Sequence, residues 1–203
     1  MVKKHSNTVN FSSISVDINT YAGIDEAGRG PLAGAVVAAA VVLGDTREWG
    51  AVRDSKALSA GRRDNLYELI RGSALAWSIG KCDVREIDEY NIFNASLLAM
   101  KRAFDGIDVP TEIALVDGKF SPELSVTSYA VIKGDNHVPA IGAASILAKV
   151  TRDREMEELD KLYPEYGFAR HKGYPTPQHL AALRRYGACS YHRKSFKPVI
   201  EVI

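Results

Sequence analysis

The nine residues 35–43, AVVAAAVVL, constrain the fold of this chain more than any other segment, because they are apolar without interruption. A run of this length that is rich in valine is typical of a strand buried on both faces, at the centre of a sheet. A short buried helix fits the pattern as well, since periodicity alone does not separate the two. The run is far shorter than the roughly 20 residues of a membrane-spanning helix, so we expect no membrane segment.

Strand and helix patterns alternate along the rest of the chain. Four further apolar stretches predict strands, at residues 21–25, 75–82, 112–117 and 126–133. Helices are expected at residues 59–71, after Asp83, at residues 139–159 and after Thr176. Strands interleaved with helices indicate an α/β domain, in which active residues tend to lie at strand ends and in the adjoining loops.

Two of these helices have clear signals at their ends. Asp83 is followed three residues later by Glu86, the spacing of a capping box. Apolar residues then recur at spacings of four, three and four, which places them on one helical face: Phe93, Leu97, Met100 and Phe104. Near the end of the chain, Thr176 and Pro177 form an N-cap and N1 pair, and Gly187 is the expected stop.

Residues 20–203 are expected to form one domain, because a chain that is 46% hydrophobic has ample material for one core. Residues 1–19 contain two lysines without a following apolar stretch, so they predict a flexible tail and no secretory signal. Residues 160–203 are expected to be mainly helical. They are also expected to be basic, since residues 161–203 hold eight Lys or Arg and only two acids. Such a basic end favours a polyanion partner. A merely solvated face fits the charge pattern equally well.

Carboxylates are predicted at the ends of three separate strands. Asp25 and Glu26 are adjacent, at the start of a glycine-rich turn, while Asp117 and Asp135 follow two later strands. Converging carboxylates repel one another unless cations lie between them, and Mg²⁺ and Mn²⁺ prefer such oxygen ligands. Two ions of this kind are a recurrent device for phosphodiester cleavage. For Asp117 taken alone, a turn or cap role is the more common one.

The segment Gly28-Arg29-Gly30 comes directly after the paired acids. Its glycines permit close backbone approach to a ligand, and Arg29 offers a planar set of donors suited to phosphate. A dinucleotide-binding loop is the obvious competitor. The spacing of the glycines does not make that motif, and Pro31 stands where its helix should begin.

Taken together and in order, the motifs resemble bacterial ribonuclease HII, a type 2 ribonuclease H. The matching segments are GIDEAGRGPLAGAVVAAAVVL, DSKALS, the VDG that contains Asp117, the KGD that contains Asp135, AASILAKVTRD, and YGFARHKGYPTPQH through YHRKSF. The resemblance implies a ribonuclease H-like α/β fold, with a mixed central sheet flanked by helices and a small helical C-terminal part. It also implies Mn²⁺- or Mg²⁺-dependent hydrolysis of RNA in RNA–DNA hybrids. The expected cut lies 5′ to single ribonucleotides in duplex DNA and leaves a 3′-hydroxyl and a 5′-phosphate.

The resemblance also implies roles for individual residues. The four metal-binding and catalytic carboxylates fall on Asp25, Glu26, Asp117 and Asp135. The backbone of Gly28-Arg29-Gly30 corresponds to the element that contacts the ribose 2′-hydroxyl, the only group that distinguishes RNA from DNA at one nucleotide. Tyr174 matches the tyrosine that packs on the sugar next to the scissile site. A half-buried interface aromatic is the alternative for Tyr174.

Basic residues are assigned to the nucleic-acid backbone on weaker grounds. Lys56 resembles a family lysine near the substrate phosphate, although a lone lysine is more often a solvated surface residue. We predict phosphate contacts without sequence preference for Arg193 and Lys194, together with Arg184 and Arg185. The histidines show no zinc-ligand spacing. Asp153 is an alternative fourth acid, although a structural role in mid-helix is favoured.

Two other functions are compatible with parts of this pattern. A nuclease of the same fold that acts on another substrate, such as DNA junctions, shares the carboxylates. A catalytically inactive nucleic-acid-binding module shares the basic end. Cys82 and Cys189 fit neither a disulfide framework nor a C-x-x-C site, so we expect reduced thiols in a cytoplasmic protein. Nothing in the sequence calls for more than a monomer.

Overall fold

A computed structural model describes residues 4–5, 21–44, 49 and 59–203 of the chain. Its centre is a five-stranded sheet in the order β4-β3-β2-β5-β7. The strands are β2 (Tyr21–Ala27), β3 (Val36–Val42), β4 (Ala76–Cys82), β5 (Ile113–Asp117) and β7 (Thr127–Val131). Strands β4, β3 and β2 pair antiparallel, whereas β2, β5 and β7 pair parallel. The sheet is therefore mixed, as the sequence predicts.

The apolar run that opens the sequence argument is the buried strand β3, and the helical alternative is wrong. All seven of its residues are inaccessible to solvent. Because successive side chains of a strand point to opposite faces, Ala39 and Val41 pack into one core, while Val36, Ala38, Ala40 and Val42 pack into another. A strand with two buried faces requires helices on both sides.

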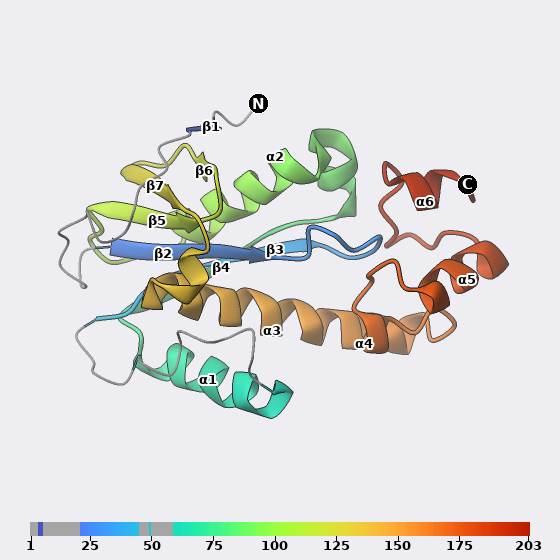
Figure 1. Cartoon of the computed structure of the whole chain (residues 1–203), viewed down its shortest axis with the longest axis horizontal. Helices are drawn as coiled ribbons and strands as arrows, with labels where there is room; N and C mark the ends of the chain where they lie inside the picture. Colours follow the sequence, from blue (N-terminus) through green and yellow to red (C-terminus); the bar gives the residue numbers. More distant parts are fainter. Residues whose placement is uncertain (1–3, 6–20, 45–48, 50–58) are drawn as a thin grey trace.

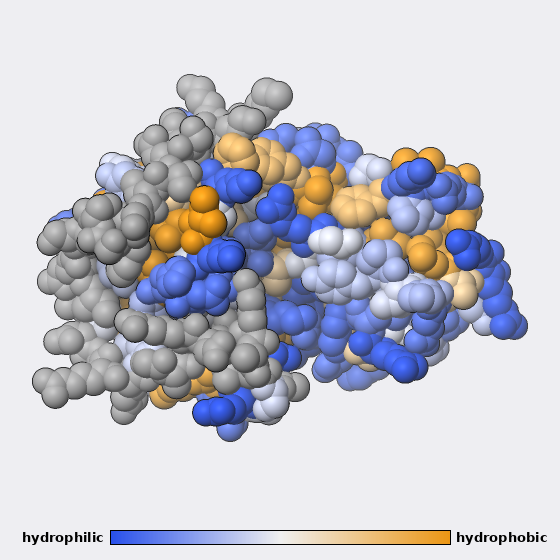
Figure 2. Space-filling view, viewed as in Figure 1, coloured by the Kyte–Doolittle hydropathy of each residue, from blue (hydrophilic) through white to orange (hydrophobic). Residues whose placement is uncertain are grey.

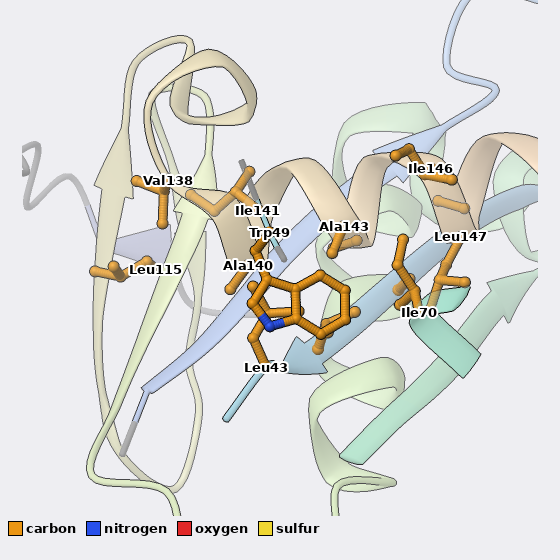
Figure 3. Packing of buried hydrophobic residues seen from close by; sticks show 14 of the residues in the cluster. Leu43, Trp49, Ile70, Leu115, Val138, Ala140, Ile141, Ala143, Ile146 and Leu147 are labelled. Carbon is orange, nitrogen blue, oxygen red and sulfur yellow. The ribbon is translucent and has the colours of Figure 1, made fainter. Parts of the chain in front are cut away.

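Helices cover both faces of the sheet (Figure 1). Helix α2 (Val84–Asp105) packs on one face, mainly against β3 and β4. Helix α3 (Pro139–Leu162) crosses the other face against β2 and β3, with α1 (Ala60–Ser73) outside it. Figure 3 shows the core under α3, where the indole of Trp49 lies among Leu43, Ile70 and Leu147.

Helix α2 begins as the sequence predicts but is interrupted once. Asp83 and Glu86 form the expected capping box, and Leu97, Met100 and Phe104 are buried. At Asn91 the backbone is left-handed, with φ 64°, and the Asn91 side chain accepts hydrogen bonds from the backbone N–H groups of Phe93 and Asn94. Asn91 thus caps a restarted helix inside the chain segment that sequence periodicity treats as one helix.

The C-terminal part consists of short helices beyond the end of the sheet (Figure 1). They are α4 (Phe168–His171), α5 (Pro177–Tyr186) and α6 (Lys197–Ile200). Thr176 caps α5 and Gly187 ends it, as predicted. Figure 2 shows apolar side chains gathered over this part of the molecule, where Leu183 and Val199 pack on Leu32.

A small second sheet and the end of β7 complete the fold. A small second sheet pairs β1 (Lys4–His5) with β6 (Ser121–Pro122). The strand predicted to reach residue 133 ends at Val131, because the chain turns there into the 3₁₀ helix η3 (Gly134–Asn136). Most of the predicted N-terminal tail, and Lys56, lie outside the described residues. No helix in the described ranges is long and apolar enough to cross a membrane.

Candidate active site

Three acidic side chains meet where β2 and β5 end. Asp25 and Glu26 lie in the last three residues of β2, opposite Ala39 and Ala38 of β3. Asp117 is the last residue of β5, and the parallel pairing of Ile24 with Val116 places it beside Asp25. Parallel pairing thus brings together carboxylates that are about ninety residues apart in the chain.

Asp135, the fourth predicted acid, lies behind this group. The chain leaves β7 through Lys133, whose backbone is left-handed, into η3. The backbone N–H of Gly134 donates to Asp117 Oδ1 at 2.7 Å, so the loop that carries Asp135 is tied to the third acid. Asp135 itself is 1% exposed and does not line the pocket that Asp25, Glu26 and Asp117 share.

The pocket measures about 400 Å³ and has two unlike walls. One wall carries the three carboxylates Asp25, Glu26 and Asp117, called here the carboxylate wall. The other carries Gly28, Arg29 and Gly30 together with Tyr174. Basic side chains that sequence reasoning did not single out also reach the pocket, namely Arg63 of α1 and Lys149 of α3. The structure therefore gathers most of the predicted site residues around one cavity.

The carboxylate wall is electrostatically strained. Burial, followed by the negative charges of Glu26 and Asp117, raises the pKa of Asp25 well above its usual range. Burial also raises the pKa of Glu26, although Arg29 opposes this effect from 3.3 Å away. Carboxylates whose charged forms are disfavoured in this way gain most from a nearby cation.

The Gly28-Arg29-Gly30 turn depends on glycine at two positions. Gly28 has φ +97°, and a Cβ there would collide with the Arg152 side chain. A Cβ at Gly30 would lie 3.3 Å from Tyr174 Cε1, so the tyrosine ring lies against this glycine. Larger residues at either position would push the turn, the arginine or the ring out of place.

Arg193 differs from its prediction as a phosphate contact. Its side chain is fully buried, and its guanidinium donates six hydrogen bonds to the carbonyl oxygens of Gly28, Arg29, Pro31, Gly34 and Ala35. A guanidinium has five N–H groups, and these bonds occupy all of them. Arg193 therefore has no donor left for a phosphate. Its guanidinium stabilises the turn instead of contacting the nucleic acid.

Arg152 of α3 supports the same turn from the other side. It donates to the carbonyls of Ala33 and Ala35 and, at 2.9 Å, to that of Lys172. It therefore links the turn to the segment that carries Tyr174. Burial lowers the pKa of both arginines, to about 9 for Arg193. We call residues 28–35, held by Arg152 and Arg193, the loop wall.

The remaining predicted residues in the described part of the chain do not line the pocket. Lys194 is exposed, and its backbone N–H donates to Asp88 at 2.9 Å. Arg184 and Arg185 are exposed on α5. Asp153 is ion-paired with Lys149 at 2.7 Å and is not part of the pocket wall. Cys82 and Cys189 are free thiols, as expected.

Sequence reasoning missed a buried histidine cluster next to Tyr174. His171, His179 and His192 are 8%, 0% and 1% exposed, and two of their rings contact through nitrogen atoms. Nothing in the spacing of these residues indicates that they meet. Among the residues that the structure describes, no three His, Cys, Asp or Glu side chains are grouped so as to enclose a metal ion.

Comparison with known proteins identifies the class of protein. The family model for ribonuclease HII matches residues 22–199. The chain is 54% identical to ribonuclease HII of Aliivibrio fischeri (strain MJ11) over 183 residues, which cover 90% of this chain and 88% of the relative. It is 55% identical to the enzyme of Aliivibrio salmonicida over the same shares of both chains.

Solved structures agree with this match. Ribonuclease H2 from Pyrococcus horikoshii superposes with a TM-score of 0.77 at 28% identity, covering 90% of this chain and 96% of that one. Ribonuclease HII from Archaeoglobus fulgidus, solved in complex with PCNA, gives 0.67 at 30% identity, with 88% and 95% covered. Bst-RNase HIII, solved with Mn²⁺, shares the fold, with a TM-score of 0.68 at 16% identity and 90% and 68% covered.

The chain is thus a ribonuclease H-fold hydrolase, and it belongs to the ribonuclease HII family. It is an endoribonuclease that acts on RNA–DNA hybrids. This family membership decides against the two alternatives, a nuclease of another substrate class and an inactive binding module.

Proposed function

We propose that this enzyme cuts on the 5′ side of single ribonucleotides embedded in duplex DNA, leaving a 3′-hydroxyl and a 5′-phosphate. One observation carries the proposal: a single pocket is lined both by the carboxylates Asp25, Glu26 and Asp117 and by the Gly28-Arg29-Gly30 turn with Tyr174. Such an arrangement combines hydrolytic chemistry with the means to recognise one sugar. Cleavage of long hybrids alone does not require the Gly28-Arg29-Gly30 turn and Tyr174 to share a pocket with the carboxylates.

We propose Asp25, Glu26, Asp117 and Asp135 as the ligands of Mg²⁺ or Mn²⁺. The donor set fits these ions, since it consists of oxygens whose negative charges repel one another when no cation is present. Mg²⁺ is usually held by one or two carboxylates together with water and substrate phosphate, so no closed protein cage is needed. Bound ions of this kind supply an activated water and stabilise the leaving oxygen. Asp135 would contribute to this set from the loop whose Gly134 backbone N–H donates to Asp117.

The loop wall is proposed to recognise the ribose. Without side chains, Gly28 and Gly30 let backbone groups approach a 2′-hydroxyl closely, which is the only feature that marks one ribonucleotide in DNA. Tyr174 lies over Gly30 and is 45% exposed, so its ring is free to pack on the next sugar along the strand. An additional hydroxyl on that sugar would collide with the ring, which favours deoxyribose on the 3′ side.

Basic residues at and around the pocket are proposed to hold phosphates. Arg29, Arg63 and Lys149 line it directly, while Lys194, Arg184 and Arg185 lie on the exposed C-terminal surface. Lys56 is proposed for the same role from its motif. Contacts of this kind add affinity that falls with salt and carry no base sequence preference.

The enzyme is further proposed to act as a cytoplasmic monomer in ribonucleotide excision. The two cysteines are free thiols, which is the usual state in a reducing compartment.

The decisive assay uses a DNA duplex that contains one ribonucleotide, with Mg²⁺ or Mn²⁺, and maps both product ends. We expect one cut, directly 5′ to the ribonucleotide, with a 3′-hydroxyl. Asp117→Asn should lower the rate by about 10³-fold or more while substrate binding persists, because the charge that holds the cation is lost. A uniform DNA duplex is the control. Absence of the cut, or near-normal activity of Asp117→Asn, would contradict the proposal.

A further inference from the structure

A chain of hydrogen bonds runs through the buried histidine cluster to the backbone of Tyr174. The backbone N–H of Cys189 donates to His192 Nδ1 at 3.0 Å. His192 Nε2 lies 3.1 Å from His179 Nε2, and His179 Nδ1 lies 2.9 Å from the carbonyl oxygen of Tyr174. Four groups from α5 and the loops beside it are thereby connected in series.

The bonds assign one set of tautomers. Because His192 Nδ1 accepts from a backbone N–H, the proton of a neutral His192 is on Nε2. That proton is donated to His179 Nε2, so His179 carries its own proton on Nδ1 and donates it to the Tyr174 carbonyl. Every nitrogen of the pair then has a suitable partner, as buried polar groups require.

Surroundings of the pair favour this neutral arrangement. Both rings are fully buried against aromatic neighbours. The His171 ring stacks on the His179 ring with 4.4 Å between ring centroids, and the Phe168 ring meets the His179 ring edge-on with 5.4 Å between centroids. Burial lowers the pKa of His179 and lowers that of His192 to about 4. Near neutral pH the pair is uncharged, and the series of bonds is intact.

The segment that carries Tyr174 depends on such bonds for its position. It follows two consecutive left-handed residues, Lys172 with φ 51° and Gly173 with φ +81°, and belongs to no helix or strand. Successive carbonyls of the segment are each held by a different part of the molecule. Arg152 donates to the Lys172 carbonyl at 2.9 Å, and the backbone N–H of Leu32 donates to that of Gly173 at 2.8 Å. The Tyr174 carbonyl accepts from the backbone N–H of Thr176 at 2.8 Å and from His179 Nδ1 at 2.9 Å, so His179 adds the bond that comes from outside this segment.

We propose that His179, oriented by His192, is a positioning residue that sets the place of the Tyr174 ring over Gly30 and thereby the choice of the sugar that follows the ribonucleotide on its 3′ side. The proposal rests on the role of Tyr174 given under Proposed function. Neither histidine lines the pocket, so both act through Tyr174 and not on the substrate.

Two substitutions at His179 separate the two ends of its ring. The amide nitrogen of asparagine replaces Nδ1, so His179→Asn keeps a donor for the Tyr174 carbonyl. The longer side chain of glutamine replaces Nε2, so His179→Gln keeps the contact with His192 and loses the bond to Tyr174. The pair differs by one methylene, and both are neutral. Phe168→Leu, in the same buried cluster, is the control for lost packing alone.

One duplex with two consecutive ribonucleotides measures the choice of sugar. A cut 5′ to the second ribonucleotide selects a ribonucleotide that is followed by deoxyribose, whereas a cut 5′ to the first selects one that is followed by ribose. The ratio of the two products does not depend on how much of the enzyme is folded. We expect His179→Gln to lower this ratio about tenfold, as a small misplacement of a positioning group does. His179→Asn and Phe168→Leu should remain within about threefold of the unsubstituted enzyme, because Tyr174 keeps its place in both.

A second readout is independent of activity. In protein labelled with ¹³C-tyrosine, the Tyr174 ring signals are assigned by their loss in Tyr174→Phe. We expect them to move in His179→Gln and to stay in place in His179→Asn. Unmoved signals in His179→Gln, or an unchanged ratio with moved signals, overturn the inference. If Tyr174→Ala itself leaves the ratio unchanged, the role of Tyr174 under Proposed function is what fails, whatever the signals in His179→Gln show.

Discussion

The two walls of the pocket hold buried charge in opposite ways. On the carboxylate wall, Asp25, Glu26 and Asp117 repel one another, and burial raises the pKa of the first two. On the loop wall, the buried cations Arg152 and Arg193 are surrounded by backbone carbonyls that accept their N–H groups. On our proposal the first wall takes up cations from solution, whereas the second already contains its own.

This difference shows that a buried charged residue beside an active site is not by that fact a substrate contact. Arg193 and Lys194 are neighbours in the chain, yet Arg193 is buried and saturated, while Lys194 is exposed. We therefore expect Arg193 to contribute to stability and Lys194 to the affinity for a polyanion. Three changes test whether the two walls differ as described.

The largest effect is expected on removal of the Arg193 guanidinium. Arg193→Met removes the guanidinium donor from five backbone carbonyls of the loop wall, of which that of Ala35 keeps Arg152, and each unsatisfied buried acceptor is costly. We expect the free energy of unfolding to fall by about 3 kcal/mol or more, measured by urea denaturation. Lys194→Ala is the matched control, with a change of about 0.5 kcal/mol or less.

Salt dependence separates the same two variants in binding. Lys194→Ala should reduce the slope of log affinity against log salt by roughly one, whereas folded Arg193→Met should keep the original slope. A reduced slope in Arg193→Met would return this residue to the phosphate contacts predicted from sequence.

Acid is expected to have the next largest effect, through the buried histidine pair that supports the Tyr174 segment. The pKa of His192 is lowered to about 4 from an ordinary value of 6.5, mainly by burial and then by His179. Between these values the unfolded chain binds more protons than the folded one, so the free energy of unfolding falls as pH falls. It should fall by roughly 3 kcal/mol between about pH 6.5 and 4, and His192 should contribute no slope above that range.

Urea unfolding across pH 4.5 to 7.5 measures this effect. His192→Phe, which cannot take up a proton, should show a flatter dependence over the same range. His137, exposed on the surface, provides the control as His137→Gln, which should keep the full slope. An equally steep slope in His192→Phe would mean that the lost stability comes from other groups.

The smallest effect is expected on the carboxylate wall, and with the opposite sign. Asp25→Asn removes a buried charge that its neighbours repel, so without divalent metal the free energy of unfolding should rise by about 1 to 2 kcal/mol. Activity should be lost at the same time, because stability and catalysis conflict at such a position. Addition of Mg²⁺ should stabilise the unsubstituted protein and not the variant. A variant less stable than the original without metal would contradict the repulsion inferred for this wall.

Local sequence patterns were enough to predict most of the helices and strands and the strand ends that carry the carboxylates. The unbroken apolar run predicted β3, and strand-end positions predicted where Asp25, Glu26 and Asp117 would lie. Such features are local, because a period of two residues, a cap or a strand end is visible within a few positions. Roles that rest on the family motifs, such as that of Tyr174, came from resemblance and remain proposals.

The packed fold was needed to show which charged and polar side chains have all their hydrogen-bonding groups satisfied. The bonds of Arg193 reach carbonyls up to 165 positions earlier in the chain, and His179 meets His192 from another element. The neighbouring residues in the sequence are the same whether a basic side chain of such a segment faces solvent or the carbonyls of a backbone turn. The difference depends on where distant backbone carbonyls come to lie, and local sequence does not encode that without the packed fold.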